Sequence, residues 1–468
     1  MPIYGGRLPS VTERCLPGEG RRCSVRNGVV VYLFSHTAVV QTEPFTSLER
    51  LMERATRPKL PVPLPLRGDQ YGSFAHQTVV ERLPRILERV LEENAFPDAV
   101  TAGLRKLLDE IPDGAIRMLR DESAPDAAEW IGYVAPHLEK DWLQAPWFFA
   151  ETYFYRRILE ATGYFQAGNA DYGQTAGVDP FAPHKAQSLE ASWERLEKLA
   201  ERVQAWRGSG WENVGLDTFL ALALWGNQGD LSMWPGGAGE MPTHDSAAAA
   251  QEHVLVDDSE VVDEYLARQQ AQAGPLRVDV LADNAGFELV SDLALIDYLL
   301  DSGRAGLVVM HLKMHPTFVS DVIRRDVQQT IAEMSAADAA ALQAWGRRLQ
   351  QYVQQGHLQM TADPFWTSPL PGWELPQSLR SSLSAAHLVI SKGDAHYRRL
   401  LGDRHWAYTA PFAQIVAYFP TALLALRTLK SEVASGLSPE QVTRLTESYP
   451  DWLTSGDWGV IQFALHNQ

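Results

Sequence analysis

Two oxygen-donor side chains, Asp283 and Asn284, stand next to each other where the sequence changes from one kind of periodicity to another. Residues 276–282 are rich in Val and Leu, as in a β-strand, and apolar residues recur every three or four positions over residues 289–300, as in a helix. The pair therefore occupies a strand-to-helix turn, in which Gly286 permits a tight backbone. Carboxylate and amide oxygens suit Mg²⁺ or Mn²⁺ better than Zn²⁺. An ordinary Asx turn that caps the helix explains the same residues, so this stretch alone leaves both interpretations open.

The second half of the chain alternates between strand-like and helix-like segments. We predict strands at residues 276–282, 306–312, 358–361 and 387–391, and helices at residues 288–300, 322–334, 337–353 and 394–401. This alternation predicts an α/β fold, a three-layer α/β/α arrangement with a mostly parallel sheet. Ligands of such sheets bind beyond the carboxyl ends of the strands, where the polar side chains of this sequence gather.

The first half of the chain is helical by periodicity, so the sheet is preceded by an all-helical domain. We expect an N-terminal extension at residues 1–58, with one possible strand at 28–34. A helical bundle domain at residues 59–270 and an α/β metal- and phosphate-binding domain at residues 271–468 follow.

The bulk composition excludes several classes of protein. With 41 Lys and Arg against 58 Asp and Glu, the formal charge is −17, which argues against general binding to nucleic acid or to an anionic membrane. Two cysteines, Cys15 and Cys23, do not make a disulfide scaffold. The first residues lack the apolar core of a signal peptide, and the longest apolar run is too short to span a bilayer. We therefore expect a cytoplasmic protein, without membrane or nucleic-acid partners, and a monomer.

The side chains that follow the predicted strands suit phosphate-ester chemistry. Asp283, Asn284 and Asp321 can supply three oxygens to one divalent cation and leave coordination positions open for water and for a substrate phosphate. These three residues are the candidate metal ligands.

Cationic and acidic groups at the same edge complete this chemistry. Lys392 and Lys430 can neutralise a phosphate, and the backbone amides around Gly393, at a helix N-terminus, are natural anion ligands. An acid beside the pocket, either Asp394 or Glu288, can orient or deprotonate the attacking water. The sequence does not choose between these two acids.

Four segments resemble the damage-control phosphatase family, long catalogued as domain of unknown function 89. They are Asp-Asn-Ala-Gly-Phe-Glu at 283–288, Phe-Val-Ser-Asp at 318–321, Lys-Gly-Asp-Ala-His-Tyr-Arg at 392–398 and Arg-Thr-Leu-Lys at 427–430. The last resembles the Arg-Thr-x-Lys mark of the third subfamily, which includes the protein named acidic-residue methyltransferase. Segments 73–75, 82–84, 151–157 and 225–232 also look like family segments, so the resemblance covers roughly residues 70–468 in the right order.

The resemblance implies a site as well as a fold. It implies a divalent metal, Mn²⁺ first with Mg²⁺, Co²⁺ or Ni²⁺ as alternatives, and a small phosphorylated metabolite such as fructose 1-phosphate as substrate. The implied catalytic residues are Asp283, Asn284, Asp321 and Asp394. The implied substrate-binding residues are Asp283, Asn284, Glu151, Lys392, Gly393, Asp394, Ala395, His396, Tyr397 and Lys430, with Asp230 as a further candidate.

One position departs from the family pattern. Residue 396 is His where the family usually has Asn, and an imidazole is bulkier and titrates near neutrality. A different substrate preference or pH optimum would follow from this change.

Two other interpretations compete with a phosphatase. The family name points to an S-adenosylmethionine-dependent carboxyl methyltransferase, but no Gly-x-Gly loop follows an early strand. A non-catalytic metabolite-binding protein would keep the same pocket. The spacing of His311 and His315 is that of a helical zinc pair, but His311 ends a predicted strand and Pro316 follows His315, which disfavours such a site.

Overall fold

The computed structural model describes residues 23–26, 29–32, 56–167, 172, 174–226 and 252–466. The chain divides into two compact units, Met1–Leu51 and Met52–Gln468. In the first unit β1 (Cys23–Arg26) and β2 (Val29–Tyr32) pair in antiparallel fashion, so a strand does form within predicted residues 28–34. Across the described ranges no helix combines the length and apolar character needed to cross a membrane.

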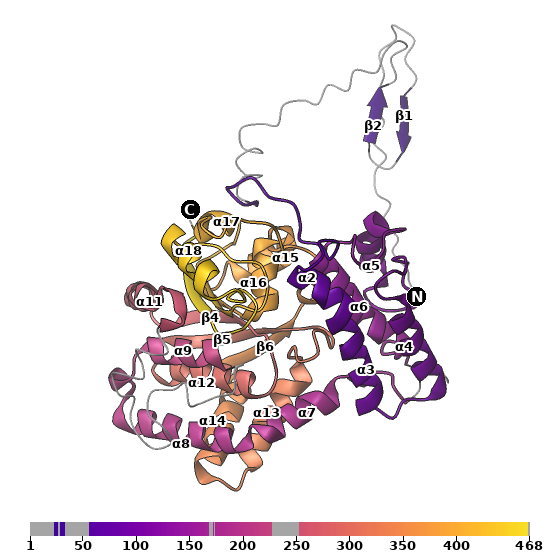
Figure 1. Cartoon of the computed structure of the whole chain (residues 1–468). Coiled ribbons are helices and arrows are strands. Elements are labelled where there is room, and N and C mark those ends of the chain that lie inside the picture. The colour runs from indigo at the N-terminus through magenta and orange to yellow at the C-terminus, as the bar shows by residue number, and fades with distance from the viewer. Residues whose placement is uncertain are drawn as a thin grey trace, which may run out of the picture. The chain divides into compact units, whose positions relative to one another are not determined.

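A seven-stranded sheet lies at the centre of the second unit (Figure 1). Its strands in chain order are β3 (Val254–Asp257), β4 (Leu276–Leu281), β5 (Ala305–Leu312), β6 (Leu358–Ala362), β7 (Leu388–Lys392), β8 (Leu423–Thr428) and β9 (Gly459–Ala464). Their order in the sheet is β3-β9-β8-β7-β4-β5-β6. Strands β8, β7, β4, β5 and β6 are parallel, whereas β9 pairs with β8 in antiparallel fashion and β3 runs parallel to β9. The predicted mostly parallel sheet is confirmed.

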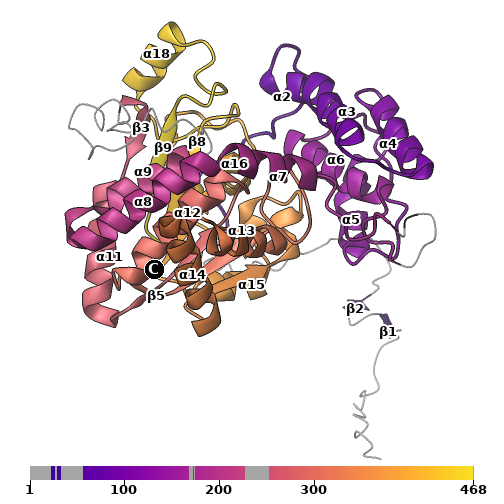
Figure 2. The same ribbon diagram turned by 90° about the horizontal axis from the view of Figure 1, so that it is seen from below.

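Helices cover both faces of this sheet, as Figure 2 shows. In chain order the helices of the second unit are α2 (Phe74–Gln77), α3 (Leu83–Glu93), α4 (Asp98–Glu110), α5 (Ala127–Val134), α6 (Trp147–Ala161), α7 (Ala182–Ala191), α8 (Trp193–Ser209), α9 (Leu216–Trp225), α11 (Ser259–Ala273), α12 (Phe287–Asp301), α13 (Arg324–Ala336), α14 (Ala340–Gln355), α15 (Gln377–Leu383), α16 (Gly393–Leu401), α17 (Phe412–Ile415) and α18 (Pro439–Ser448). Val278 and Val280 share one apolar core with α8, α9, α12 and α14. Leu281 and Val389 belong to a second core with α6 and α16. The central strands are thus buried on both faces, which explains their nearly continuous apolar sequence.

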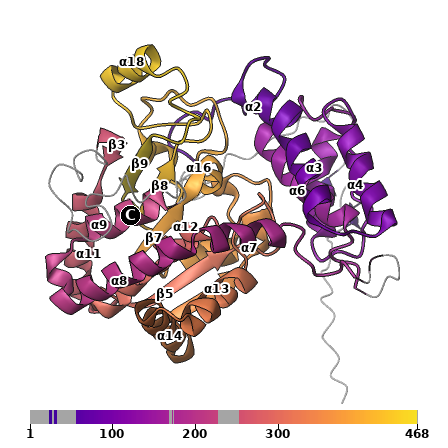
Figure 3. The same ribbon diagram turned by 60° about the horizontal axis from the view of Figure 1, so that its bottom comes forward.

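The N-terminal helices α2 to α6 gather beside the sheet (Figure 3), which confirms the predicted helical region. Helix α6 is their centre, since every residue from Trp147 to Glu160 is buried. Such a helix can carry charges only if they are paired. Arg156 accordingly pairs with Asp121 and Asp126. A π-helix, Thr78–Arg82, joins α2 to α3.

The expectation of an uninterrupted helical segment up to residue 270 is wrong at one place. Strand β3 lies inside that segment and forms an edge of the sheet, and α8 and α9 pack in the core of the sheet. A four-residue strand is too short to show a periodicity in the sequence. Strands β8 and β9 were likewise not predicted. Since residues 52–468 form one compact unit, the boundaries at 58 and 270 stay predictions.

Candidate functional site

The two segments that carry the predicted metal ligands are held together by backbone hydrogen bonds. Asp283 and Asn284 follow β4, and Asp321 ends the loop that follows the neighbouring β5. The Val322 amide donates to the Asp283 carbonyl (2.8 Å), and Asn284 and Asp321 form an isolated antiparallel bridge. The loop doubles back through Phe318 and Val319, both of which have positive φ (45° and 66°). Strain of this kind in residues other than glycine is typical of functional sites.

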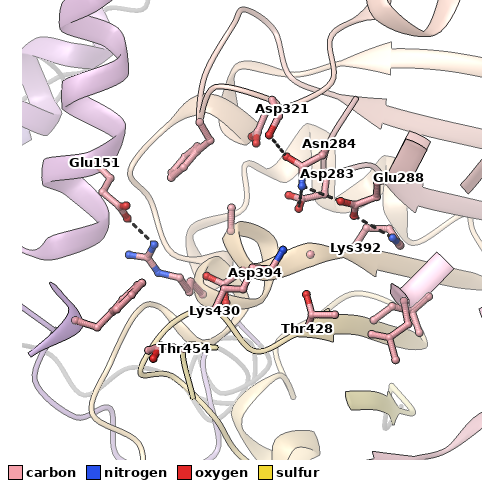
Figure 4. A pocket seen from close by; sticks show the side chains of 18 of the residues that line it. Glu151, Asp283, Asn284, Glu288, Asp321, Lys392, Asp394, Thr428, Lys430 and Thr454 are labelled. Carbon is pink, nitrogen blue, oxygen red and sulfur yellow. Dashed lines mark hydrogen bonds and ion pairs between the residues drawn. The ribbon is translucent and has the colours of Figure 1, made fainter. Parts of the chain in front are cut away.

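The predicted metal ligands share one pocket with Glu288, as Figure 4 shows. The amide nitrogen of Asn284 donates to Asp283 Oδ2 (2.7 Å) and to Glu288 Oε2 (2.9 Å). Ser320 Oγ donates to the amide oxygen of Asn284 (2.6 Å). Lys313 Nζ lies 3.0 Å from Asp321 Oδ2. These contacts hold Asp283 Oδ2, the amide oxygen of Asn284 and Asp321 Oδ2 in place.

Negative charge is concentrated at this place. Burial raises the pKa of Asp283 well above its usual range, and the neighbouring carboxylates of Glu288 and Asp321 raise it further. Burial also raises the pKa of Asp321, against the opposing charge of Lys313. Asp283 Oδ1 is buried and has no hydrogen-bond partner among the described residues. Since unpaired buried charge is costly, these oxygens fit a bound cation.

The donor set is one of hard oxygens. Among the described residues no group of three His, Cys, Asp or Glu side chains is arranged to hold a metal ion, and the set proposed here includes the amide of Asn284. His311 Nε2 contacts Asp279 (2.9 Å), and His315 Nδ1 donates to the carbonyl of Pro316 (3.1 Å). The two histidines are thus occupied separately, as the strand geometry predicts. Oxygen donors without a soft ligand favour Mn²⁺ or Mg²⁺ over Zn²⁺.

Lys392 lines the floor of the pocket but is bound to the protein. Its ammonium group lies 3.2 Å from Glu288 and 2.9 Å from Asp292, and it donates to the carbonyl of Ala223 (2.6 Å). An ammonium group has three hydrogens, and these three partners can accept all of them. The predicted contact of Lys392 with a phosphate stays a prediction, while its visible contacts stabilise two buried carboxylates.

The N-terminus of α16 lies directly against the Asp283 carboxylate. Gly393 has a φ of +78°, and a Cβ at this position would overlap the Asp283 carboxylate. Only glycine therefore fits between the helix and this carboxylate. The first turn of the helix, with Asp394 and Ala395, lines the pocket. Its backbone amides and helix dipole favour an anionic ligand.

Asp394 carries its charge and keeps one oxygen available. Arg427 Nε (2.8 Å) and Ser431 Oγ (2.9 Å) both donate to Oδ1. Burial raises the pKa of Asp394, but Arg427 and Arg398 outweigh burial and hold the pKa below its usual value. Asp394 is therefore ionised at neutral pH, and Oδ2 takes part in neither of these two hydrogen bonds.

Lys430, beyond β8, supplies a positive charge to the pocket. It is half-buried, lines the pocket beside Thr428, and forms no ion pair with any of the described residues. Figure 4 shows it on the same side of the pocket as Asp394. Its ammonium group is thus the cation best placed to accept a phosphate.

The helical region contributes the remaining wall. Glu151 of α6 forms an ion pair with Arg398 of α16, whose guanidinium also pairs with Asp403 (2.8 Å) and lies 3.6 Å from the centre of the Trp147 ring. Burial raises the pKa of Glu151, against the charge of Arg398. Glu151 therefore does reach the pocket, as expected, but within an ion pair.

Two predicted substrate ligands do not line the pocket. The His396 ring contacts Lys313 Nζ (3.0 Å), and the Tyr397 hydroxyl donates to Gln462 (2.8 Å). Both side chains are buried, because each residue along a helix turns by about 100° and positions 396 and 397 face the core rather than the pocket. The substrate-binding roles of both residues stay predictions, but the expectation that His396 titrates near neutrality is wrong. Burial and the charge of Lys313 lower its pKa well below the usual range.

Several lining residues were not predicted as ligands. They are Phe74, Arg82, Trp147, Leu224, Phe318, Ser320, Arg398, Leu426, Thr428, Thr454 and Ser455. Arg82 and Arg398 stand in segments that look like family segments, which was the only signal for them. Asp230 and the rest of residues 227–232 lie outside the described residues.

Comparison with known proteins gives one consistent result. A family model described as the damage-control phosphatase ARMT1-like domain matches residues 78–445. A zebrafish (Danio rerio) protein named damage-control phosphatase ARMT1 is 33% identical over 84% of this chain and 95% of its own length. The human protein of the same name is 32% identical over 86% of this chain and 98% of its own length. A crystal structure of a DUF89 family protein from Pyrococcus horikoshii covers 86% of this chain and all of that chain, at 14% identity and a TM-score of 0.42, and this slight likeness supports no further conclusion.

Proposed function

The chain belongs to the ARMT1-like damage-control phosphatase family, and on that premise we propose that it is a metal-dependent phosphatase of small phosphorylated metabolites. The observation that carries this proposal is the meeting of two opposite features in one pocket. Asp283 and Asp321 present buried, under-compensated carboxylates, and Lys430 with the first turn of α16 presents groups that bind anions. A divalent cation bound between the acidic wall and a substrate phosphate would account for both features.

Asp283, Asn284 and Asp321 would hold the divalent ion, with Mn²⁺ as the first choice. Bound there, such an ion would act as a Lewis acid toward the phosphoryl group and lower the pKa of a bound water. The protein groups around it keep the ligands in place. Lys313 contacts Asp321, and Asn284 Nδ2 contacts Asp283 and Glu288.

The chain's own residues bind and orient the ester. The Lys430 ammonium and the free amides at the start of α16 would neutralise the phosphate oxygens. Of the two candidate acids, Asp394 is better placed to accept a proton from the attacking water or to orient it. Glu288 has both oxygens engaged, by Asn284 and Lys392, whereas the two hydrogen bonds to Asp394 use a single oxygen.

The size of the pocket limits the substrate. Its volume of about 360 Å³ suits a small metabolite, and its walls are mainly polar. Glu151, Arg82 and Arg398 lie on the wall from the helical region and α16, where the non-phosphate part of the substrate would bind. A sugar phosphate such as fructose 1-phosphate has the size and the hydroxyl groups for these partners. A cytoplasmic location and a monomeric state complete the proposal.

The test is phosphate release from a panel of sugar phosphates and p-nitrophenyl phosphate, with Mn²⁺, Co²⁺, Ni²⁺ or Mg²⁺ against EDTA. We expect metal-dependent release that Asp321→Ala abolishes. The Asp98→Ala variant is a matched control, because Asp98 is an acid in the first turn of α4 and lies outside the lining of the pocket. No release of phosphate from any ester, although metal is bound, would contradict the proposal. Incubation with S-adenosylmethionine would then test the methyltransferase alternative.

A further inference from the structure

A second cavity, of about 230 Å³, lies where the helical region meets the segment 369–371 and the C-terminal end of α16. Its walls are largely apolar and include Tyr133, Phe148, Phe149 and several prolines. Two arginines, Arg399 and Arg404, line the same cavity. An apolar cavity with a few convergent polar groups is the usual form of a small-molecule site.

Neither of these two arginines contacts an acidic side chain of the described residues directly, although the charges of Asp403 and Glu374 act on Arg404 from further away. Arg399 is 3% exposed and donates only to the Ser368 hydroxyl and to the carbonyls of Trp366, Ser368 and Leu370. Arg404 donates to the carbonyl of Pro63 (3.2 Å). Over the described residues neither arginine forms an ion pair, and the Nε of each is buried without a hydrogen-bond partner.

Burial disfavours the charged form of Arg399. Burial lowers the pKa of Arg399 to about 9, with only slight opposition from Asp321, Tyr133 and Tyr418. The one acid in the lining, Asp403, has its carboxylate engaged by Arg398 and by the amide of Phe148. Two guanidinium groups thus share a cavity whose only carboxylate is already neutralised, and an added anion would relieve this cost.

We propose that this cavity is a binding site for a small aromatic carboxylate. Its carboxylate would accept from the Nε of Arg399, the one donor of that guanidinium without a partner among the described residues, and from Arg404, and its ring would lie against Phe148, Phe149 and Tyr133. The volume admits one ring but not a nucleotide or a peptide, and the two oxygens of a carboxylate can accept from two separate guanidinium groups.

This site is separate from the proposed phosphatase site, although α16 borders both. Arg398 lines the first pocket, whereas the next residue, Arg399, lines the second cavity. None of the candidate metal ligands lines the second cavity. Binding there can therefore be tested without any assumption about the reaction.

The experiment is titration calorimetry of benzoate into the full chain, with benzyl alcohol as an uncharged compound of the same shape. We expect saturable binding of benzoate at concentrations up to about 5 mM, and binding of benzyl alcohol at least ~10-fold weaker.

Two variants locate the site. Gly132 of α5 lines the cavity and has open space at its Cβ position, so Gly132→Leu fills the cavity without a clash at the backbone. Gly208→Leu is the matched control, since Gly208 of α8 has the same open surroundings but lies outside this cavity. We expect Gly132→Leu to abolish binding, Gly208→Leu to preserve it, and Arg404→Met to weaken it at least ~10-fold.

Two results would overturn the proposal. They are the absence of saturable binding and benzoate binding that Gly132→Leu leaves intact. Equal binding of benzyl alcohol and benzoate would show that the cavity binds apolar molecules without a role for the arginines. This result would also refute the proposal.

Discussion

Replacing Gly393 by alanine tests whether the N-terminus of α16 sets the position of the Asp283 carboxylate. A Cβ at residue 393 would lie 2.8 Å from Asp283 Cβ and still closer to the carboxylate, whereas real Cβ atoms keep at least 3.0 Å from their neighbours. Asp283 would therefore have to move by something on the order of 1 Å. A displacement of this size at a reacting centre costs about 10²-fold in rate.

The backbone contributes a second, smaller effect. Gly393 has a φ of +78°, and a residue with a Cβ in the left-handed region costs about 1 kcal/mol of stability. Gly356 separates the two effects, because its φ is +79° and no atom lies closer than 4.0 Å to its Cβ position. Gly356→Ala should therefore lose about 1 kcal/mol of unfolding free energy and keep its activity.

The assays are Mn²⁺ binding by titration calorimetry, phosphate release, and urea unfolding of both variants. We expect Gly393→Ala to bind Mn²⁺ at least ~10-fold more weakly than Gly356→Ala, and its turnover to fall about 10²-fold. If the two variants bind the metal and turn over equally, the approach of the helix to Asp283 has no part in forming the site.

Three further perturbations test the site and its surroundings. Asp283→Ala should abolish Mn²⁺ binding and lower turnover at least ~10²-fold, while its circular dichroism spectrum stays that of the native fold. Full activity of this variant without added metal would contradict the mechanism. Lys430→Ala should raise KM about 10-fold at nearly constant kcat, as the loss of uniform phosphate binding does; a collapse of kcat at constant KM would assign Lys430 to the transition state. Burial lowers the pKa of His315 in the folded chain to about 4. Between pH 6.5 and pH 4 the unfolded chain therefore binds a proton at this residue that the folded chain does not. As a result, the free energy of unfolding decreases as the pH falls. At pH 5 the loss from this group is about 2 kcal/mol relative to pH 7.5, and His315→Gln should remove that part of the pH dependence of urea unfolding.

The convergence of the predicted metal ligands follows from the sequence because parallel strands bring their carboxyl ends to one edge of a sheet. Asp283, Asn284 and Asp321 follow the neighbouring strands β4 and β5, so their convergence needs only the strand pattern. Among the strands of the sheet that escape prediction, β8 is buried on both faces and shows no alternation, and β3 is four residues long.

The roles of basic residues are harder to predict from sequence. A lysine after a strand and an arginine on a helix have the same appearance whether they meet solvent, a carboxylate or a ligand. Lys392 is engaged by Glu288, Asp292 and a carbonyl, while Lys430 is free of ion pairs with the described residues. That distinction depends on the packing of α12 and α9 against β7, which no local pattern contains.

The histidine at position 396 shows how packing decides what a substitution means. The Nε2 atom of His396 lies 3.0 Å from Lys313 Nζ, which can only donate, and 3.2 Å from the carbonyl of Ala282, which can only accept. Lys313 in turn contacts Asp321, 3.0 Å away. Burial and the charge of Lys313 lower the pKa of His396 and keep the ring neutral. We therefore expect the pH optimum to be set by groups in the pocket rather than by this ring.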